Sequence, residues 1–597
     1  MIFNVYSYCA IKQRVGNLIG RRSILPPDIN IPARAIFIWN ERPDLQSSFN
    51  IKDIKGREGL VRWYVINGFV ELGLNLESED NVLVASLGQN LAHTRQLSFL
   101  PVSWLMRLFI DRFPSKDRLS LKSAQDQDQL LCWFFAHALE AANLAPFLTG
   151  DQAMALLATD DETDALKGGR LLRCIWASTP HLRVLFASPQ DPAFRDWCLS
   201  DHGLRAFPIL THPLIALARP PARSPRRQRP FGVNLFGHAY ARSGISEDMR
   251  MACRTLETAQ IPFVIRNIAP GSDMREEDAV NSVQDMTLPY AINMFCMPAA
   301  STIAAVLKMG RAQVADHYSI GFWPWELPEF PVFWRHAYEC IDEIWASTRY
   351  TCAAFSRSSP HIVRHVPFAV DTSESDGLGR REFALPHDRF LFGFAFDGLS
   401  SFARKAPLAT VQAFRQAFAP DDHSVGLVIK GLRVEGDPAW SEIIHAIGDD
   451  TRINLITSSL ARGSVLDLWR SLDCFISLHR SEGFGRNIAE AMLLEKPVIV
   501  TAHSGNMDFT DHATAALVPC ALRLVKDGEY PFGTGQVWAE PDIHAAAVQM
   551  RHVVNDHSLR QQRVRNGREK IIELYDLKVV GRIWHKRLQD IYKTQDV

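Results

Sequence analysis

After residue 230 the sequence alternates short apolar runs with amphipathic stretches, and this alternation limits the fold more than any other feature of the chain. Buried strands of a parallel sheet are continuous apolar runs, because helices cover both faces of the sheet. The pattern predicts an α/β fold with two doubly wound, Rossmann-like domains, over residues 231–375 and 376–577. The predicted strands are 231–236, 262–266, 342–346 and 362–366 in the first domain, and runs beginning near 389, at 425–431, at 473–479 and at 496–501 in the second.

Residues 1–218 lack this alternation. Three tryptophan-centred apolar runs, around Trp63, Trp133 and Trp197, follow one another there at spacings of 70 and 64 residues. Their periodicity is helical, so we predict an all-α region with about three divergent repeats that bury one another's apolar faces. This region is expected to be structural or to bind a protein partner.

The stretch RPPARSPRRQRP, residues 219–230, separates the two regions. Proline and arginine leave no helical or strand period in it, which predicts an interdomain linker. Its five arginines could also contact anionic lipid headgroups, so peripheral contact with a membrane is the alternative interpretation.

The composition excludes several classes of protein. Apolar residues make up 47% of the 597 residues, charged residues 22%, and the formal net charge is −1, as in an ordinary globular protein that binds no nucleic acid. The ten cysteines include no C-x-x-C pair, so neither a zinc site nor a disulfide framework is predicted. We find no signal peptide and no uninterrupted apolar run of about 18 residues, which predicts a cytoplasmic location.

The segment SLHRSEGFGRNIAEAMLLEKPVIVTAHSGNMDF, residues 477–509, follows a predicted strand of the second domain, where ligands bind in open α/β sheets. Gly483 and Gly485 fall in the loop, and the next helix directs its amino terminus to the same place, which favours a diphosphate. Glu482 and Glu490 have seven residues between them. Glu490 lies about a turn inside the helix, where a carboxylate can accept hydrogen bonds from two ribose hydroxyl groups. The alternative is that neither glutamate binds a ligand: Glu482 is then an acid in a loop near a helix amino terminus, and Glu490 is a solvated acid on the helix.

The string E-G-F-G-x-x-x-x-E-A-M, followed by K-P-V-I-V and S-G-N, resembles the signature of the large retaining glycosyltransferase family 4, also called group 1 transferases. The resemblance extends from about residue 231 to about 590 and leaves out the helical repeats. It implies the GT-B architecture, two Rossmann-like domains facing each other across a cleft, with the nucleotide sugar held by the second domain and the acceptor by the first. Members generally need no divalent metal, so neither a metal nor a cofactor is expected.

The resemblance also implies roles for particular residues. Glu490 would bind the donor ribose, and Glu482 would lie beside the transferred sugar. Lys405 matches the lysine that neutralises the diphosphate in such enzymes. Backbone contacts to sugar and diphosphate are expected from Gly483, Phe484 and Gly485.

One position departs from the family pattern. The family usually places an arginine shortly before that lysine, at the end of the first strand of the donor domain, and Asp397 stands there in this chain. The second cation for the phosphates must then come from elsewhere. Lys430, at the end of the strand 425–431, and Arg404, next to Lys405, are the two candidates.

On the acceptor side, the loop after the first predicted strand carries Gly237, His238 and Gly244. A glycine-bearing loop between a strand and a helix can direct backbone N–H groups toward an anion. His238 is a candidate for contact with substrate because histidine carries protons near neutral pH, and a structural histidine is the alternative. Glu326, in the string FWPWELP, is a candidate for the edge of the cleft.

The expected function is transfer of a hexose from a UDP- or GDP-linked donor to a glycan, lipid-linked or other acceptor, with retention and without a metal, in bacterial surface polysaccharide synthesis. A catalytically weak scaffold, or another GT-B enzyme such as a sugar epimerase or phosphorylase, is the alternative. The expected partners are the donor, the acceptor, a protein on the helical repeats and a membrane surface. A C-terminal helix at 578–597 is predicted to pack back on the acceptor-side domain.

Overall fold

The structure is a computed structural model. It describes residues 25–26, 31–72, 80–91, 94–114, 116–142, 144, 147–158, 169–212, 229–241, 243–268, 288–309, 313–314 and 316–595. Most of the predicted linker, residues 219–228, lies outside these ranges. Within them the chain forms two compact units, the first ending at Leu185 and the second beginning at Phe186.

The first unit is helical, as predicted. Its helices are α1 (Ala33–Glu41), α2 (Pro43–Ser48), α3 (Ile54–Trp63), α4 (Phe69–Glu71), α5 (Asn81–Gly88), α6 (Trp104–Phe109), α7 (Ala124–Trp133), α8 (Leu139–Ala141), α9 (Gly150–Leu157), α10 (Gly169–Ser178) and α11 (Pro180–Leu185). Helices α3 and α7 share one form: each ends on a repeated tryptophan and continues into a five-residue π-helical segment and a three-residue helix. The shared form covers two of the three predicted repeats, and the repeats themselves stay a prediction.

The second unit begins with a helical segment that the sequence placed in the first region. Helices α12 (Pro192–Cys198) and α13 (Asp201–Ala206) precede the first sheet. Lys308 Nζ of α16 (Ala299–Met309) donates a hydrogen bond to Asp196 Oδ1 of α12 at 2.6 Å. The division between the two units therefore falls after residue 185, because α12 and α13 pack with the α/β part of the chain.

The first α/β domain contains a parallel six-stranded sheet in the order β2-β1-β3-β4-β5-β6. Its strands are β1 (Val233–Gly237), β2 (Phe263–Asn267), β3 (Ile292–Cys296), β4 (Tyr318–Gly321), β5 (Glu343–Ala346) and β6 (Ile362–His365), and its helices include α15 (Gly244–Thr258), α16 and α18 (Arg349–Ser356). The strand order reverses between β1 and β3, so the loops after these two strands flank a common crevice.

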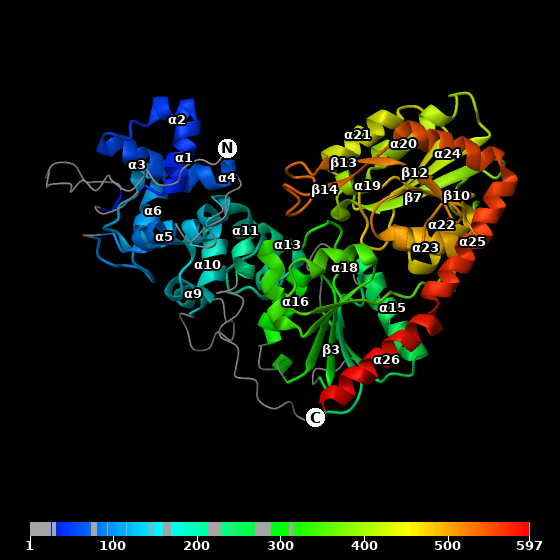
Figure 1. The fold of residues 1–597 in the computed structure, drawn as a ribbon, viewed down its shortest axis with the longest axis horizontal. Helices are drawn as coiled ribbons and strands as arrows, with labels where there is room; N and C mark the ends of the chain where they lie inside the picture. Colours follow the sequence, from blue (N-terminus) through cyan, green and yellow to red (C-terminus); the bar gives the residue numbers. More distant parts are fainter. Residues whose placement is uncertain are drawn as a thin grey trace, which may run out of the picture. The chain divides into compact units, whose positions relative to one another are not determined.

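The second domain contains a parallel sheet in the order β12-β11-β10-β7-β8-β9, which from its other edge is the 3-2-1-4-5-6 order of a Rossmann fold. The strands are β7 (Phe390–Asp397), β8 (Val425–Leu432), β9 (Ile453–Ile456), β10 (Cys474–Ser477), β11 (Val498–Thr501) and β12 (Ala516–Val518), and β13 (Cys520–Leu524) and β14 (Val537–Pro541) form a separate hairpin. The helices are α19 (Phe402–Lys405), α20 (Pro407–Ala417), α21 (Pro438–Ile447), α22 (Arg462–Ser471), α23 (Arg486–Leu493), α24 (Ile543–Asn555) and α25 (His557–Tyr575). The two doubly wound domains confirm the predicted fold class (Figure 1).

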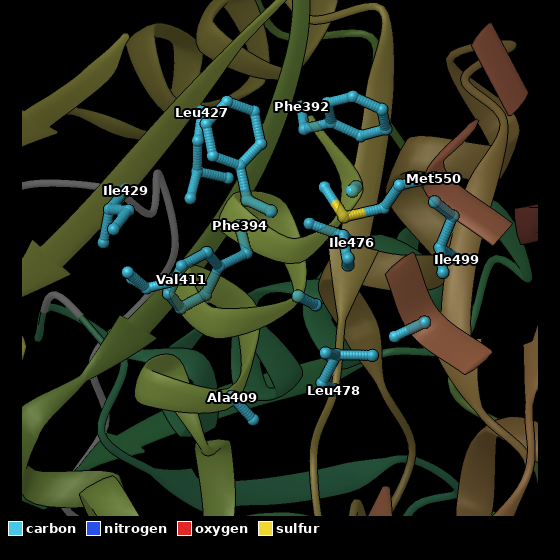
Figure 2. Close-up of a cluster of buried hydrophobic side chains, with 14 of the residues drawn as sticks. Phe392, Phe394, Ala409, Val411, Leu427, Ile429, Ile476, Leu478, Ile499 and Met550 are labelled. Carbon is cyan, nitrogen blue, oxygen red and sulfur yellow. The ribbon is translucent and has the colours of Figure 1, made fainter. Parts of the chain in front are cut away.

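Figure 2 shows the apolar core on one face of this second sheet. The side chains that meet there are at most 3% exposed and come from three strands and two helices: Phe392, Phe394, Leu427, Ile429, Ile476, Val411 and Met550. Burying a side chain of this size contributes about 1.5–3 kcal/mol. The core therefore fixes the carboxyl ends of β7 and β10, from which the loops of the candidate site begin.

The last helix, α26 (Leu577–Gln595), packs on the first α/β domain although it follows the second. Val580, Trp584 and Leu588 are buried in the core of the first domain. Trp584 Nε1 donates a hydrogen bond to the carbonyl oxygen of Pro367 at 3.1 Å. Figure 1 shows α26 (red) alongside α15, its neighbour in that domain.

Candidate functional site

A cavity of about 310 Å³ lies between the two α/β domains, at the carboxyl ends of β7 and β10. The strand order of the second sheet reverses at this point, which is where ligands bind in such folds. The wall includes Glu326 from the first domain and Glu482 from the second. A second cavity of about 210 Å³ adjoins it, since Ser243, Gly244 and Lys405 line both.

The carboxylate of Glu482 is the centre of a buried ionic cluster in the larger cavity. Lys405 Nζ donates to its Oε1, and Arg404 Nη1 donates to its Oε2 at 3.2 Å. Burial by itself raises the pKa of Glu482, but the charges of Lys405 and Arg404 outweigh burial and lower this pKa to about 2. Glu482 is therefore ionised near neutral pH, and it holds both cations at the cavity wall.

Arg404 and Lys405 reach Glu482 from the short helix α19, which follows β7. The side chain of Ser401 caps this helix by accepting a hydrogen bond from Arg404 N at 3.2 Å. Arg404 is 4% exposed, and it also donates to the carbonyl oxygens of Ser400 at 3.1 Å and Ser481 at 2.9 Å. Protein atoms thus hold the Arg404 guanidinium in place, whereas Lys405 has Glu482 as its closest partner.

The loop from Gly483 to Gly485 approaches both the first domain and the next helix. A Cβ at Gly483 would lie 2.6 Å from the carbonyl oxygen of Trp325, so this glycine makes room for protein backbone. Thr348 Oγ1 donates to the carbonyl oxygen of Gly483 at 2.7 Å. Gly485, with φ 93°, precedes α23, and no side chain among the described residues caps that helix. The uncapped amino terminus of α23 lies at the cavity wall and favours an anion.

Phe484, between the two glycines, anchors this loop. Its ring contacts Phe509 and Tyr575, with centroid distances of 5.6 and 5.3 Å. The side chain is 8% exposed. Its aromatic contacts fix the loop, so the expected backbone contacts to a ligand would come from a rigid segment.

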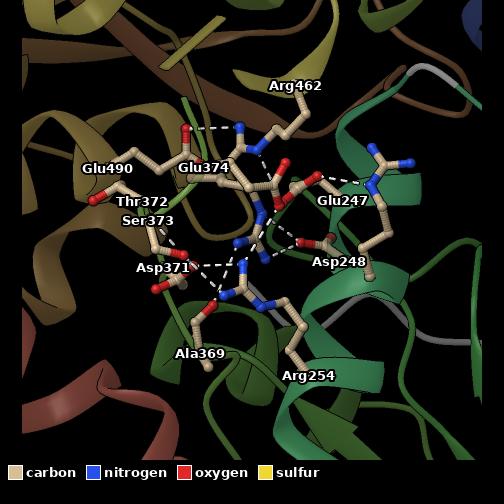
Figure 3. A network of polar contacts seen from close by, with 12 residues as sticks. Glu247, Asp248, Arg254, Ala369, Asp371, Thr372, Ser373, Glu374, Arg462 and Glu490 are labelled. Carbon is tan, nitrogen blue, oxygen red and sulfur yellow. Dashed lines mark hydrogen bonds and ion pairs between the residues drawn. The ribbon is translucent and has the colours of Figure 1, made fainter. Parts of the chain in front are cut away.

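Glu490 lines neither cavity, and its side chain is fully buried. Its carboxylate accepts hydrogen bonds from Arg462 Nη2 at 2.7 Å and Nη1 at 3.3 Å (Figure 3). Arg462 Nε lies 3.1 Å from Glu247 Oε1 of α15, so one guanidinium joins a carboxylate from each α/β domain. Arg462 and Glu247 line the smaller cavity, and the expected ribose ligand Glu490 lies behind Arg462.

Asp397, at the position of the family arginine, binds an arginine from the neighbouring strand end. Arg433 follows β8 and donates from Nε to Asp397 Oδ1 at 3.1 Å, with an ion pair to Oδ2. Lys430 lies within β8 rather than at its end, and it lines the smaller cavity. Burial lowers the pKa of Lys430 to about 8, so this amine is a cation below that pH.

The acceptor-side candidates divide into two pairs. Gly244 and Glu326 line the larger cavity, with Gly244 as the first residue of α15 rather than part of the preceding loop. Gly237 and His238 are not among the residues that line either cavity. The backbone of β3 leaves no room for a side chain at Gly237, and His238 is 3% exposed with Nδ1 2.6 Å from the carbonyl oxygen of Ile268. The geometry favours the structural alternative for His238.

The sequence did not indicate that the β13–β14 hairpin contacts the first domain. Tyr530, in the hairpin loop, donates from Oη to Glu326 Oε2, and Gln536 Oε1 accepts a hydrogen bond from Glu329 N at 2.9 Å. Burial raises the pKa of Tyr530, so its hydroxyl stays protonated and donates to Glu326. Proline and glycines at 531–535 signal a turn, but nothing in the sequence gives its partner.

Arg486 is a further residue that the sequence did not single out. It lines both cavities, and it donates from Nε to Asp248 Oδ1 at 2.8 Å and from Nη1 to the carbonyl oxygen of Ala369 at 3.3 Å. Its position directly after E-G-F-G, at the first turn of a helix, was the available signal. Arg486 therefore adds a second link between the domains beside that of Arg462.

Among the described residues, no group of three or more His, Cys, Asp or Glu side chains is arranged to hold a metal ion. In the same part of the chain, no helix has the length and apolar character needed to cross a membrane.

Two Rossmann-type domains with a cavity between the ends of their strands, and a last helix that returns to the first domain, define the GT-B class of fold. Residues 402–570 match the family model described as glycosyl transferases group 1. That match confirms, for this part of the chain, the resemblance given by the E-G-F-G segment.

One curated relative is the capsular polysaccharide biosynthesis glycosyltransferase CapM of Staphylococcus aureus, 28% identical over 129 residues. That match covers 22% of this chain and 28% of the relative, so it spans little more than a quarter of the relative's length. Similar solved structures include HepE of Anabaena in complex with UDP and glucose, at 13% identity and a TM-score of 0.44, covering 60% of this chain and 100% of HepE. Another is sucrose-phosphate synthase of Thermosynechococcus elongatus, at 14% identity and a TM-score of 0.45, covering 61% and 100%.

Proposed function

We propose that the protein is a retaining, metal-independent glycosyltransferase that moves a hexose from a nucleotide sugar to a glycan or lipid-linked acceptor. The observation that carries the proposal is the Glu482–Lys405 pair beside the uncapped amino terminus of α23, in a domain that matches the group 1 family. When the bond between sugar and diphosphate breaks, negative charge develops on the departing phosphate. Preorganised positive groups stabilise that charge and lower the barrier.

Three groups of the chain are proposed to supply this charge: Lys405, the amino terminus of α23, and Lys430 as the second cation. Lys430 lines the smaller cavity and is charged below about pH 8, whereas the donors of Arg404 are shared among protein oxygens. These groups make a metal unnecessary for neutralising the diphosphate, which supports the metal-independent reaction.

Glu482 is proposed to hold Lys405 in place and to lie beside the transferred sugar. The acceptor is proposed to attack the face of the sugar from which the diphosphate departs, assisted by that phosphate. Such an attack would retain the configuration of the transferred sugar. The nucleoside is proposed to occupy the smaller cavity, where Arg462 and the Glu490 behind it form the wall for the ribose. Glu326 and Gly244 are then on the acceptor side of the larger cavity.

The acceptor is proposed to be an intermediate in the synthesis of bacterial surface polysaccharide. The similarity to a capsular polysaccharide glycosyltransferase over 129 residues supports this assignment. A cytoplasmic location, a protein partner on the first unit and contact with a membrane surface stay predictions.

The proposal is tested by calorimetric binding of UDP and GDP in EDTA to the wild type and to Lys405→Met and Glu490→Gln. One nucleotide should bind, and each variant should bind it about tenfold more weakly or worse. Lys405→Met removes a charge-assisted hydrogen bond to the diphosphate, and Glu490→Gln weakens the one that holds Arg462 at the ribose wall. Such a bond contributes about 1.5–3 kcal/mol. Lys586→Met, at an exposed position on α26, is the matched control and should bind as the wild type does. If UDP, GDP and ADP all fail to bind, the donor site is refuted, and the alternative of a catalytically weak scaffold is favoured.

A second assay separates the enzyme classes. With the nucleotide sugar that corresponds to the bound nucleotide, a transferase releases the nucleotide faster when an acceptor is added. An epimerase converts the sugar without any acceptor, and a phosphorylase requires inorganic phosphate. Nucleotide release that is unchanged by a panel of glycan and lipid-linked acceptors, together with formation of a sugar 1-phosphate from a glycan and inorganic phosphate, would replace the transferase by a phosphorylase.

A further inference from the structure

The first, helical unit contains a cavity of its own. Its volume is about 480 Å³, and all the residues that line it belong to this unit. Sites that bind small molecules commonly have volumes of about 300–1,000 Å³ and combine aromatic side chains with a few polar groups. The proposed reaction uses the cavities between the α/β domains and gives this one no role.

The wall formed by the start of α3 is closely packed. Asp53 caps the helix by accepting a hydrogen bond from Gly56 N at 2.7 Å. A Cβ at Gly59 would lie 2.7 Å from the Phe49 ring, so the missing side chain lets this ring lie against the helix. Trp39 Nε1 donates a hydrogen bond to the carbonyl oxygen of Phe49 at 2.9 Å. Phe49 and Gly59 both line the cavity, so this wall is a packed part of the unit.

Trp63, the last residue of α3, also lines the cavity. Trp133 has the same place at the end of α7, and its ring contacts the Phe113 ring edge to face at a centroid distance of 5.5 Å. Among the described residues, no aromatic ring contacts Trp63 in this way. The Arg42 guanidinium lies 5.8 Å from the centroid of the Trp63 ring but is not a residue of the cavity wall. Packing on a second ring therefore occupies Trp133, whereas part of the Trp63 indole faces the cavity.

Positive charge predominates on the cavity wall. The charged residues that line it are Lys55, Glu58, Arg62 and Arg112. Arg62 Nη2 donates to Asp111 Oδ2 at 2.6 Å, in an exposed pair outside the lining. Arg112 Nη2 donates to the amide oxygen of Asn67, a neutral partner, at 3.2 Å. The three cations outnumber the carboxylates even when Asp111 is counted with Glu58, so the wall favours an anionic ligand.

We propose that this cavity binds an acidic oligosaccharide, with one sugar ring stacked on Trp63 and an anionic substituent bound by Lys55 and Arg112. The flat, apolar indole packs against the C–H face of a pyranose ring. The guanidinium fork and the ammonium group bind a carboxylate through charge-assisted hydrogen bonds.

The inference goes beyond the proposed function, because α3 lies outside residues 402–570, the part that matches the family model. The choice of a saccharide over an acidic peptide rests on the proposed function, since a glycosyltransferase has glycans among its substrates and products. The helical unit would then hold a glycan by itself, in addition to any binding at the donor and acceptor sites.

The test is calorimetric titration of the full chain with three probes: trigalacturonate, the neutral trisaccharide maltotriose, and the acidic peptide tetraglutamate. The variants are Trp63→Leu and the double variant Lys55→Gln/Arg112→Gln. Both residues of the double variant are exposed, so it should fold as the wild type does. Lys52→Gln is the matched control, since Lys52 is an exposed lysine of the same segment that does not line the cavity. Nucleotide affinity and thermal unfolding are measured for each variant.

Trigalacturonate should bind the wild type and Lys52→Gln about fivefold or more tightly than the other two probes. Trp63→Leu should weaken the binding of trigalacturonate, and the double variant should remove the preference over maltotriose, both without a change in nucleotide affinity. Absence of trigalacturonate binding, equal or tighter binding of tetraglutamate, or a preference that survives in the double variant would overturn the proposal while the donor site stands. Failure of every nucleotide to bind would instead refute the proposed function.

Discussion

Replacement of Arg462 by methionine should destabilise the second unit far more than replacement of another arginine in the same polar network. Arg462 is the hydrogen-bond donor that the structure places on the Glu490 carboxylate, and the Glu490 side chain is 0% exposed. Methionine keeps most of the apolar length of the side chain but leaves this carboxylate buried beside an apolar group. Glu247 keeps Arg250 Nε at 2.9 Å and is less affected.

The magnitude follows from burial. Removing one partner of a buried ion pair costs about 3–5 kcal/mol, because the remaining charge has lost both its counter-charge and its water. Arg254 provides the matched control: its pairs with Asp371 and Glu374 belong to the same network in Figure 3, but its side chain is 30% exposed. An exposed pair contributes about 0–1 kcal/mol, so Arg254→Met should change stability by no more than that.

The assay is equilibrium unfolding in urea, followed by circular dichroism, for the wild type and the two single variants. The double variant Arg462→Met/Glu490→Met is measured as well. It should recover most of the loss, since replacing both partners of a buried pair by apolar groups is often nearly neutral. Equal effects of Arg462→Met and Arg254→Met, or a double variant less stable than Arg462→Met alone, would show that the pair does not carry the burial cost assigned to it.

Three further predictions concern the pH, the loop and the last helix. In the folded protein the pKa of Lys430 is lowered from 10.5 to about 8, so between these pH values the unfolded chain binds more protons than the folded one. The free energy of unfolding should therefore rise with pH across this window. Lys430→Met should flatten that rise when urea titrations are repeated at a series of fixed pH values. Gly485→Ala, at φ 93°, should cost about 1–3 kcal/mol by the same unfolding assay, whereas Gly88→Ala, with no neighbour within 4 Å of the added Cβ, should cost much less. Trp584→Ala should cost about 3–5 kcal/mol, and a thermal unfolding profile that matches the wild type would show that α26 is not part of the first domain's core.

The sequence was sufficient for the strands with isolated apolar runs. The runs at 425–431 and 496–501 became β8 and β11 almost without change. Strand β3 was missed because Ile292–Cys296 lies in a longer apolar stretch that continues into α16, where periodicity does not separate strand from helix. Strand β9 was missed because Asn454, a residue that is uncommon in strands, interrupts the apolar residues of Ile453–Ile456.

The candidate site was predicted as far as its chemistry depends on local sequence. The glycine loop and the helix that follows it come from the family motif, which also indicated Glu482 and Lys405 as separate residues of the donor site. The pairing of Glu482 with this lysine, 77 residues earlier, was not predicted. Such a motif does not predict which residues form ion pairs with these charged side chains. Neither the binding of Arg433 to Asp397 nor the burial of Glu490 under Arg462 has a local signature, because each depends on which strand or helix lies beside another.

The return of α26 to the first domain means that the chain passes between the two α/β domains twice. The two passages lie side by side, since Val370 N, on the way out, donates a hydrogen bond to the carbonyl oxygen of Tyr575, on the way back, at 2.9 Å. Two adjacent tethers act as a hinge with one axis: they permit the domains to rotate apart but resist sliding or twisting. If the larger cavity opens, the walls that carry Glu326 and Glu482 would move apart along one arc. The two walls would then return to the same relative position each time the cavity closes.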